Sequence, residues 1–369
     1  MAALTPMEAM QMAIEEGRKG QGFVSPNPLV GCVIVDRDQR FLSTGYHAKV
    51  GSDHAEAAAL KAISDQSLLQ DATVYVTLEP CAHEGRTPSC AKALAQLPIK
   101  KVVYGLMDPN PLVSGQGVEI LRAAGKEVEQ FHGLRDELEE LAEIFLTNMR
   151  ERRVFVGLKV ASSLDGRIAL LNGESQWITG EPARALVHEW RGSYDAVLTG
   201  AGTLLRDNPR LNSRDGRFRD KPSTLIVLDP EGGIASRWTE LKAAEVRRPE
   251  DVLVVVKKGA GQGAKVPVLE ASMHGEHFDL QQILAALFQR GLRSLFVEAG
   301  GFTASSFLRE KLADRLYLFL APKILGQGLS WSEGLRISAI DKALTFEKPA
   351  VRWLGEDLLW TARIRRSSP

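Results

Sequence analysis

Short runs of β-branched and apolar residues alternate along this chain with segments whose apolar residues follow helical spacing. In the first part we expect strands over 29–36, 72–79 and 100–108 and helices over 7–19, 55–63, 90–97 and 116–124, followed by a short strand and a charged helix from Leu134. Strands that are apolar throughout are covered on both faces, and alternation with helices is typical of parallel sheets. The chain is therefore predicted to be α/β, with largely parallel sheets in three-layer domains.

The alternation restarts at a charged joint, NMRERRV, over residues 148–154. The chain has 369 residues, more than the roughly 250–300 at which a single core stops growing. We therefore expect two domains, 1–150 and 151–369. In the second we expect strands over 154–163, 195–200, 223–229, 251–257, 294–299 and 315–322, helices over 182–191, 279–290 and 303–310, and a polar loop at 206–222 that could line a site.

Three cysteines are too few for a disulfide framework, and the first residues carry acidic side chains instead of the apolar core of a signal peptide. No stretch approaches the roughly 20 apolar residues of a membrane span. We therefore expect a cytoplasmic protein with no membrane partner. Residues 1–150 hold 14 Lys and Arg against 20 Asp and Glu, which disfavours nucleic acid as a partner. The remainder holds 32 against 26, a mildly basic balance that suits phosphorylated small molecules.

Two of the three cysteines, Cys81 and Cys90, lie in one Pro- and Gly-rich loop, and the segment His54-Ala55-Glu56 precedes a predicted helix. Two thiolates and one imidazole are a usual ligand set for catalytic Zn²⁺, whose fourth position takes water. Glu56 stands at the spacing of a proton carrier beside that metal. The pattern H-x-E followed by P-C…C is typical of zinc deaminases, in which water attacks an amino-bearing carbon of a pyrimidine or purine.

The spacing of the two cysteines departs from the usual C-x2-C of such sites, because eight residues separate them. His83, which lies between them, is an alternative ligand to His54. A second alternative is that both cysteines are small buried hydrophobic residues, although a Pro/Gly-rich loop makes a poor core. Cys32 lies inside an apolar strand and is expected to be a core residue.

Several stretches resemble one family, the bifunctional riboflavin-biosynthesis deaminase/reductases. In the first half these are PNPLVGCVIV (26–35), GYHAKVGSDHAE (45–56), PCAHEGRTPSC (80–90) and DPNPLVSGQG (108–117). In the second half they are LKVASSLDGRIA (158–169), ESQWITG (174–180), DAVLTGAGTLLRDNPRLNSR (195–214) and VEAGGFTASSFL (297–308). The resemblance implies a cytidine-deaminase-like fold followed by a dihydrofolate-reductase-like fold, and a homodimer or homotetramer.

For the first domain the resemblance implies hydrolytic deamination of 2,5-diamino-6-(5-phosphoribosylamino)pyrimidin-4-one. It implies a zinc site of His54, Cys81 and Cys90 with Glu56 as the catalytic proton carrier. The residues that it implies for the pyrimidine or its ribose phosphate are Asn27, His47, His83 and Arg86. Arg86 is chemically suited to a phosphate, but it could also be a solvated surface charge, and His47 could be an ordinary core or surface histidine.

For the second domain the resemblance implies reduction of the ribosyl group of that product to ribityl, with NADPH as the hydride donor. The implied cofactor contacts are Ala161, Trp177, Thr203, Asp207, Gly300 and Gly301. A glycine turn that feeds a helix, as at 300–301, can hold a phosphate on free backbone N–H groups. No complete G-x-G-x-x-G motif follows a strand, so a Rossmann fold is not expected.

The implied substrate contacts of the second domain are Ser175, Arg191, Leu211, Arg214 and Glu298. Arg191 and Arg214 are chemically suited to binding a phosphate, but both could also be ordinary surface charges. Lys159 interrupts an otherwise apolar strand, so we expect it to face the site and to assist proton or imine chemistry as a catalytic residue. Asp165-Gly166 is more simply explained as a turn, and the stretch after Asp229 is assigned no cofactor contact.

Two other functions remain open on the sequence alone. One is a nucleic-acid editing zinc deaminase with an appended binding domain, which would need a basic first half. The other is a structural zinc protein in which the Cys/His loop only holds the fold together; Glu56→Gln would then leave ammonia release unchanged.

Overall fold

A five-stranded sheet organises the first part of the chain, in the strand order β2-β1-β3-β4-β5. The strands are β1 (Gly31–Val35), β2 (Phe41–Tyr46), β3 (Thr73–Leu78), β4 (Lys101–Leu106) and β5 (Glu127–Gln130). β3, β4 and β5 run parallel, as expected, whereas β1 runs antiparallel to both β2 and β3. β1, which was expected as a strand of a largely parallel sheet, is thus antiparallel to both of its neighbours, and β2 was not expected as a strand. β2 escaped the sequence analysis because it is only partly buried and mixes polar with apolar residues.

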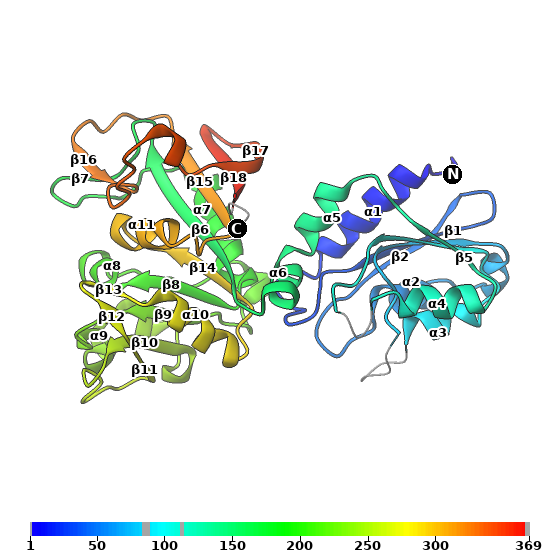
Figure 1. Cartoon of the computed structure of the whole chain (residues 1–369), viewed down its shortest axis with the longest axis horizontal. Coiled ribbons are helices and arrows are strands. Elements are labelled where there is room, and N and C mark those ends of the chain that lie inside the picture. Colours follow the sequence, from blue (N-terminus) through cyan, green and yellow to red (C-terminus); the bar gives the residue numbers. More distant parts are fainter. Residues whose placement is uncertain (1, 83–88, 111–113, 366–369) are drawn as a thin grey trace. The chain divides into compact units, whose positions relative to one another are not determined.

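Helices cover both faces of this sheet, which gives the expected three layers (Figure 1). α1 (Pro6–Arg18) and α5 (Arg135–Leu141) pack on one face, and α2 (Ala55–Lys61), α3 (Cys90–Ala95) and α4 (Gln116–Ala123) pack on the other. α6 (Glu143–Glu151) follows α5. The start of α1 is fixed by a capping box, in which the Thr5 side chain accepts from the Glu8 N–H and the Glu8 carboxylate accepts from Thr5.

A nine-stranded sheet organises the rest of the chain, in the order β11-β10-β9-β8-β14-β6-β15-β18-β17. Its strands are β6 (Phe155–Ser163), β8 (Ala196–Gly200), β9 (Thr224–Leu228), β10 (Val252–Lys257), β11 (Val268–Ala271), β14 (Ser294–Glu298), β15 (Arg315–Ala321), β17 (Phe346–Leu354) and β18 (Asp357–Ile364). All neighbours from β11 to β15 pair in parallel, whereas β18 and β17 pair antiparallel. Two short pairs lie outside this sheet, β7 (Arg167–Leu170) with β16 (Gly328–Ser330) and β12 (Met273–His274) with β13 (His277–Phe278).

The helices of this second part are α7 (Glu181–Ser193), α8 (Ala201–Asp207), α9 (Gly233–Ser236), α10 (Leu280–Gln289) and α11 (Gly301–Arg309). α10 and α11 pack on one face of the nine-stranded sheet, and α9 and Trp238 pack on the other. Trp190 of α7 lies against Phe296 and Phe319 of the central strands. Short 3₁₀ turns occupy Gly216–Phe218, Trp238–Glu240, Lys242–Glu245, Pro249–Asp251 and Ile340–Lys342. One further 3₁₀ turn, Gln66–Leu69, lies in the first part of the chain.

The structure is a computed structural model that describes residues 2–82, 89–110 and 114–365. The chain divides into two units, Met1–Arg152 (unit 1) and Arg153–Pro369 (unit 2). Each strand expected in the second half has its counterpart, but the sequence analysis missed β7, β11, β12, β13, β16, β17 and β18. Within the described ranges, the helices are all too short or too polar to span a bilayer.

Candidate active sites

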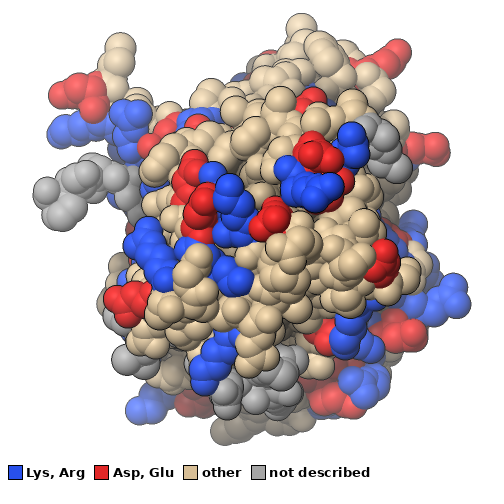
Figure 2. All heavy atoms as spheres, turned by 90° about the vertical axis from the view of Figure 1, so that its right-hand side faces the viewer, with Lys and Arg blue, Asp and Glu red and all other residues tan. Residues whose placement is uncertain are grey.

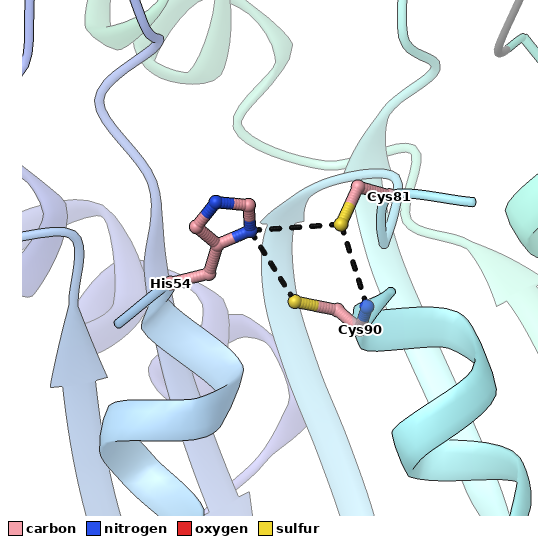
Figure 3. Close-up of side chains that lie close together, drawn as sticks. All are labelled: His54, Cys81 and Cys90. Carbon is pink, nitrogen blue, oxygen red and sulfur yellow. Dashed lines mark hydrogen bonds between the residues drawn. The ribbon is translucent and has the colours of Figure 1, made fainter. Parts of the chain in front are cut away.

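The structure brings the side chains of His54, Cys81 and Cys90 together at one end of the unit 1 sheet (Figure 3). His54 immediately precedes α2, Cys81 follows β3, and Cys90 is the first residue of α3. The three potential ligand atoms lie within 4.8 Å of one another. The Nδ1 atom of His54 is the ring nitrogen that faces the sulfurs, at 3.5 Å from Cys81 Sγ and 3.4 Å from Cys90 Sγ.

These distances fit a tetrahedral zinc site. Zn–S and Zn–N bonds of about 2.3 and 2.05 Å at a tetrahedral angle place nitrogen and sulfur about 3.6 Å apart. The observed separations of 3.4–3.5 Å match that value without movement of the backbone. The described residues supply three ligands, and a three-ligand set with an open fourth position is the arrangement of catalytic rather than structural zinc.

Local structure holds the two sulfurs in place. The backbone carbonyl of Cys81 accepts from the Ser89 hydroxyl and from the Ala91 N–H, so the start of α3 is tied to the first cysteine. The backbone N–H of Cys90 points at Cys81 Sγ, 3.4 Å away. The Cys90 thiol and the neighbouring His54 lower the pKa of Cys81 to about 4, although burial opposes them. This environment favours the thiolate form of Cys81, and a bound metal ion would favour that form at both sulfurs.

Glu56 lies in the first turn of α2, two residues from His54, and is 4% exposed. Burial, and next the nearby Cys81 thiolate, raise the pKa of Glu56 to about 7. A carboxyl group with a pKa near neutrality can both take up and release a proton, which is what a general acid–base group needs. The structure thus places Glu56 in an environment that suits the role expected from the sequence.

Asn27 and His47 form a hydrogen-bonded pair beside His54. The Nδ1 atom of His47 lies 3.0 Å from the backbone carbonyl of Asp53, and Nε2 lies 3.1 Å from the Asn27 side-chain nitrogen. A carbonyl can only accept, so Nδ1 carries the proton and Nε2 accepts from Asn27. Burial lowers the pKa of His47, which keeps this neutral form at physiological pH. The ring stands edge-on to His54, with 5.3 Å between centroids.

Two residues expected at this site, His83 and Arg86, lie outside the described residues. Their roles, including His83 as an alternative ligand, therefore stay predictions. Cys32 is fully buried within β1 and packs in the core, as expected.

Glu79 is a buried carboxylate that the sequence analysis did not identify. It is 4% exposed and follows β3, two residues before Cys81. Its two oxygens accept backbone N–H groups from Asp108, Gly115, Gly117 and Val118, at 3.0–3.4 Å. It therefore caps the N-terminus of α4, where a negative charge is favourable. No sequence signal identifies such a cap, because the carboxylate lies 36 residues or more from the α4 N–H groups that it accepts.

In unit 2 most of the positions expected to bind the cofactor lie along the carboxyl edge of the parallel strands. Thr203 and Asp207 are in α8, directly after β8; Gly300 and Gly301 begin α11, directly after β14; Ala161 is near the end of β6. These three strands are neighbours in the order β8-β14-β6. Crevices at the carboxyl ends of parallel strands are the usual ligand sites of α/β folds.

Trp177 lies in the segment between β7 and α7 and is 63% exposed. The guanidinium of Arg184 stands 4.7 Å from its ring centroid, and the Lys323 ammonium donates to its backbone carbonyl. Lys323 follows the carboxyl end of β15, so this contact anchors Trp177 at the same edge of the sheet. Ser175 lies half-buried in the same segment.

Lys159, Arg191 and Glu298 form a charged cluster on one face of the unit 2 sheet. Glu298 of β14 is the lateral neighbour of Lys159 on β6, and their charged atoms are 3.7 Å apart. Arg191 of α7 donates to both oxygens of Glu298, at 2.5 and 2.9 Å. Burial lowers the pKa of Lys159, which Glu298 opposes. Arg191 is thus engaged by a carboxylate of the protein itself, a partner that the sequence analysis did not foresee.

Leu211 and Arg214 lie on the polar segment after α8. Leu211 is 5% exposed, whereas Arg214 is exposed and lines an open groove along α7. His188 of α7 and Arg352 of β17 line the same groove. The groove is also lined by Glu189 and Asp215, so it presents two arginines and two carboxylates, with charges of both signs.

Charges of both signs intermingle on the face of the molecule drawn in Figure 2, where Lys and Arg form no continuous basic patch among the described residues. This pattern gives no support to a nucleic-acid surface on that face.

Two family models match the chain. Residues 5–106 match the cytidine and deoxycytidylate deaminase zinc-binding region, and residues 154–359 match the RibD C-terminal domain. The two matches fall within units 1 and 2, respectively.

Curated relatives match along nearly the whole length. Riboflavin biosynthesis protein RibD of Aquifex aeolicus is 39% identical over 95% of this chain and 96% of that protein. Riboflavin biosynthesis protein RibD of Escherichia coli is 35% identical over 95% of this chain and 96% of that protein.

Solved structures match equally well. RibD of Acinetobacter baumannii is 38% identical, with a TM-score of 0.82 over 97% of this chain and 98% of that chain. The diaminohydroxyphosphoribosylaminopyrimidine deaminase/5-amino-6-(5-phosphoribosylamino)uracil reductase of Thermotoga maritima is 37% identical, with a TM-score of 0.83 over 97% and 98% of the two chains.

Proposed function

The chain belongs to the RibD family of bifunctional deaminase/reductases of riboflavin biosynthesis, and we propose that unit 1 carries the deaminase and unit 2 the reductase. The proposed first reaction converts 2,5-diamino-6-(5-phosphoribosylamino)pyrimidin-4-one to its deaminated product. The second reduces the ribosyl group of that product to ribityl with NADPH. The observation that carries the first assignment is the convergence of His54, Cys81 and Cys90 beside the buried Glu56.

His54, Cys81 and Cys90 are the residues that would hold zinc. The metal, when bound, lowers the pKa of a water molecule so that the water becomes a nucleophile at neutral pH. Two thiolates and a neutral imidazole balance the charge of the dication, so the zinc-loaded ligand set is neutral overall.

Glu56 is the proposed proton carrier of the deaminase. As a buried carboxylate two residues from His54, it is placed to take a proton from the attacking water and to return it to the departing amino group. His47 in its neutral form is held in place by hydrogen bonds to Asp53 and Asn27, and its polar ring lies against His54. His83 and Arg86 complete the proposal as contacts to the substrate.

In unit 2 the proposed cofactor positions are Ala161, Trp177, Thr203, Asp207 and the Gly300–Gly301 turn, along the carboxyl edge of the sheet. The nicotinamide supplies the hydride, so the tasks left to the protein are to orient the sugar and to transfer a proton. We assign the proton to Lys159, whose ammonium Glu298 stabilises. Arg214, Ser175 and Leu211 are proposed to meet the substrate, and Arg191 to act largely through its ion pair with Glu298.

The two activities can be tested on one preparation of the full chain. Ammonia release from the phosphorylated diaminopyrimidine, together with metal content, tests the deaminase. Glu56→Gln should retain zinc and lose about 10²–10⁴-fold in ammonia release, while oxidation of NADPH by the deaminated product should stay unchanged. Retention of full deaminase activity by Glu56→Gln would exclude the proposed role and would favour a structural zinc site. Failure to oxidise either NADPH or NADH would exclude the reductase.

The remaining partners follow from this proposal. A phosphorylated small molecule is the proposed substrate of both units, and the family match gives no support to a nucleic-acid editing function. A homodimer or homotetramer stays a prediction, to be tested by light scattering. A cytoplasmic setting is likewise proposed, on the ground that all three cysteines are unpaired.

A further inference from the structure

Arg247 is a buried arginine that no motif of the sequence marks. It follows the 3₁₀ turn at Lys242–Glu245 and is 6% exposed. Its Nη2 atom donates to the backbone carbonyl of Leu211, at 2.6 Å. Its Nε atom is buried and has no hydrogen-bond partner within the part of the chain that the structure describes. Burying a guanidinium is costly unless it is paired, so the position of Arg247 calls for a specific explanation.

The segment that Arg247 holds is conformationally demanding. Leu211 has a φ of 51°, in the left-handed region that leucine rarely adopts. Such a conformation persists only where surrounding contacts impose it. The charged hydrogen bond from Arg247 to the Leu211 carbonyl is one such contact, and the burial of the Leu211 side chain in the core is another.

The same segment is held from its other side by α7. The backbone carbonyl of Asn212 lies 3.1 Å from His188 Nδ1 and 3.5 Å from Arg191 Nη1. The Ser213 hydroxyl donates to the backbone carbonyl of His188, at 2.6 Å. Residues 211–213 therefore lie between Arg247 and the helix that carries the Arg191–Glu298 ion pair.

This arrangement places like charges near one another. Burial, and next the charge of Arg191, lower the pKa of Arg247 to about 10. Both guanidiniums stay charged at neutral pH, so they repel each other across a partly dry interior. The adjoining groove is lined by Arg214, Arg352 and His188 and also by Glu189 and Asp215, so it carries charges of both signs. The two arginines of the groove are the groups that the phosphate of the proposed substrate would meet.

We propose that Arg247 is a positioning residue of the reductase, which fixes residues 211–213 so that Leu211 and Arg214 meet the phosphorylated substrate. This inference rests on the proposed function of unit 2. Arg247 does not touch the substrate itself, because its unpaired Nε is inaccessible. It acts through the backbone of Leu211 and through its charge.

The test compares three variants of the full chain. Arg247→Met removes both the hydrogen bond and the charge, and Arg247→Lys keeps the charge and one possible donor. Arg248→Met is the matched control, since Arg248 is the exposed neighbour, with 66% of its side chain accessible, and pairs with Asp251 at the surface. For each variant, kcat and KM are measured with the deaminated phosphorylated pyrimidine, together with KM for NADPH and the rate of ammonia release by unit 1.

We expect Arg247→Met to raise KM for the pyrimidine about 10- to 100-fold, the range for losing a hydrogen bond from a charged group. KM for NADPH and ammonia release should stay unchanged, Arg247→Lys should recover part of the loss, and Arg248→Met should behave like the wild type. Calorimetric titration with the deaminated pyrimidine alone, which needs no turnover, should show the same loss of affinity. An unchanged KM and dissociation constant in both Arg247 variants, whatever their melting temperature, would overturn the inference. A wild-type chain that binds the pyrimidine but fails to reduce it would instead refute the proposed function.

Discussion

Replacing Glu56 by glutamine should stabilise the metal-free protein while it destroys the deaminase. Glu56 is 4% exposed, and burial, followed by the Cys81 thiolate, raises its pKa from 4.5 to about 7. Folding therefore opposes ionisation of this carboxyl group. At about 1.4 kcal/mol for each tenfold change in proton affinity, the change from 4.5 to about 7 corresponds to about 3 kcal/mol.

The sign of the effect depends on pH. Below pH 4.5 the group is protonated in both the unfolded and the folded chain, so it contributes no penalty. Between 4.5 and about 7 the unfolded chain loses this proton first, and the free energy of unfolding falls. Above about 7 the penalty is complete. Glutamine is neutral throughout, so Glu56→Gln should match the wild type near pH 4.5 and exceed it by about 3 kcal/mol at pH 8.

Urea unfolding of the full chain after treatment with EDTA, at pH 5 and pH 8, measures this difference. The transition of unit 1 is identified as the one that shifts when zinc is added. Glu127→Gln is the control, because Glu127 is exposed and forms only a surface ion pair with Lys100. With zinc bound, the dication favours the carboxylate and the gain should vanish. Equal stability of metal-free wild type and Glu56→Gln at pH 8 would refute the reasoning.

Other predictions follow from the same contacts. Removing the metal, or changing Cys81 to Ser, should stop ammonia release and leave NADPH oxidation intact; loss of both activities together would contradict two separate sites. Glu298→Gln should lower the pKa of Lys159 further, so that the reductase rate declines at a lower pH than in the wild type, as a pH–rate profile would show. Asp314→Asn should destabilise unit 2 by about 3 kcal/mol in urea unfolding, because Asp314 accepts from Arg153 through both oxygens in a mostly buried ion pair; a change below about 0.5 kcal/mol, typical of a surface pair, would show that it contributes little.

The sequence predicted the central strands of both sheets because their signal is local. β3, β9 and β10 are largely continuous apolar runs that are buried along nearly their whole length. The edge strands were missed for the opposite reason. β17 reads FEKPAVRWL and exposes most of its side chains, so neither alternation nor an apolar run marks it. Its pairing with β18 depends on tertiary structure that the sequence does not display.

The direction of β1 was also beyond the sequence. β1 is as apolar as a parallel strand because helices cover both its faces, yet it runs antiparallel to β3. Burial, and not direction, sets the apolar pattern of a strand. A pattern of continuous apolar residues therefore identifies a covered strand without revealing how it pairs.

The two candidate sites differ in how much the sequence revealed, and residue type explains the difference. Histidine and cysteine are uncommon in this chain, so their spacing carried information before any fold was known. Arginine and glutamate are abundant and mostly exposed. The family resemblance marked Arg191, Glu298 and Leu211, but nothing in the sequence paired Arg191 with Glu298 or Arg247 with Leu211. These pairs join residues 107 and 36 positions apart. Because burying a charge costs much free energy, a buried arginine is expected to have a hydrogen-bond or ion-pair partner or a functional role. Burial is thus the observation that suggests a function for an ordinary residue type. For Arg247, the hydrogen-bond partner among the described residues is one backbone carbonyl, that of Leu211, in the segment that carries the proposed substrate contacts.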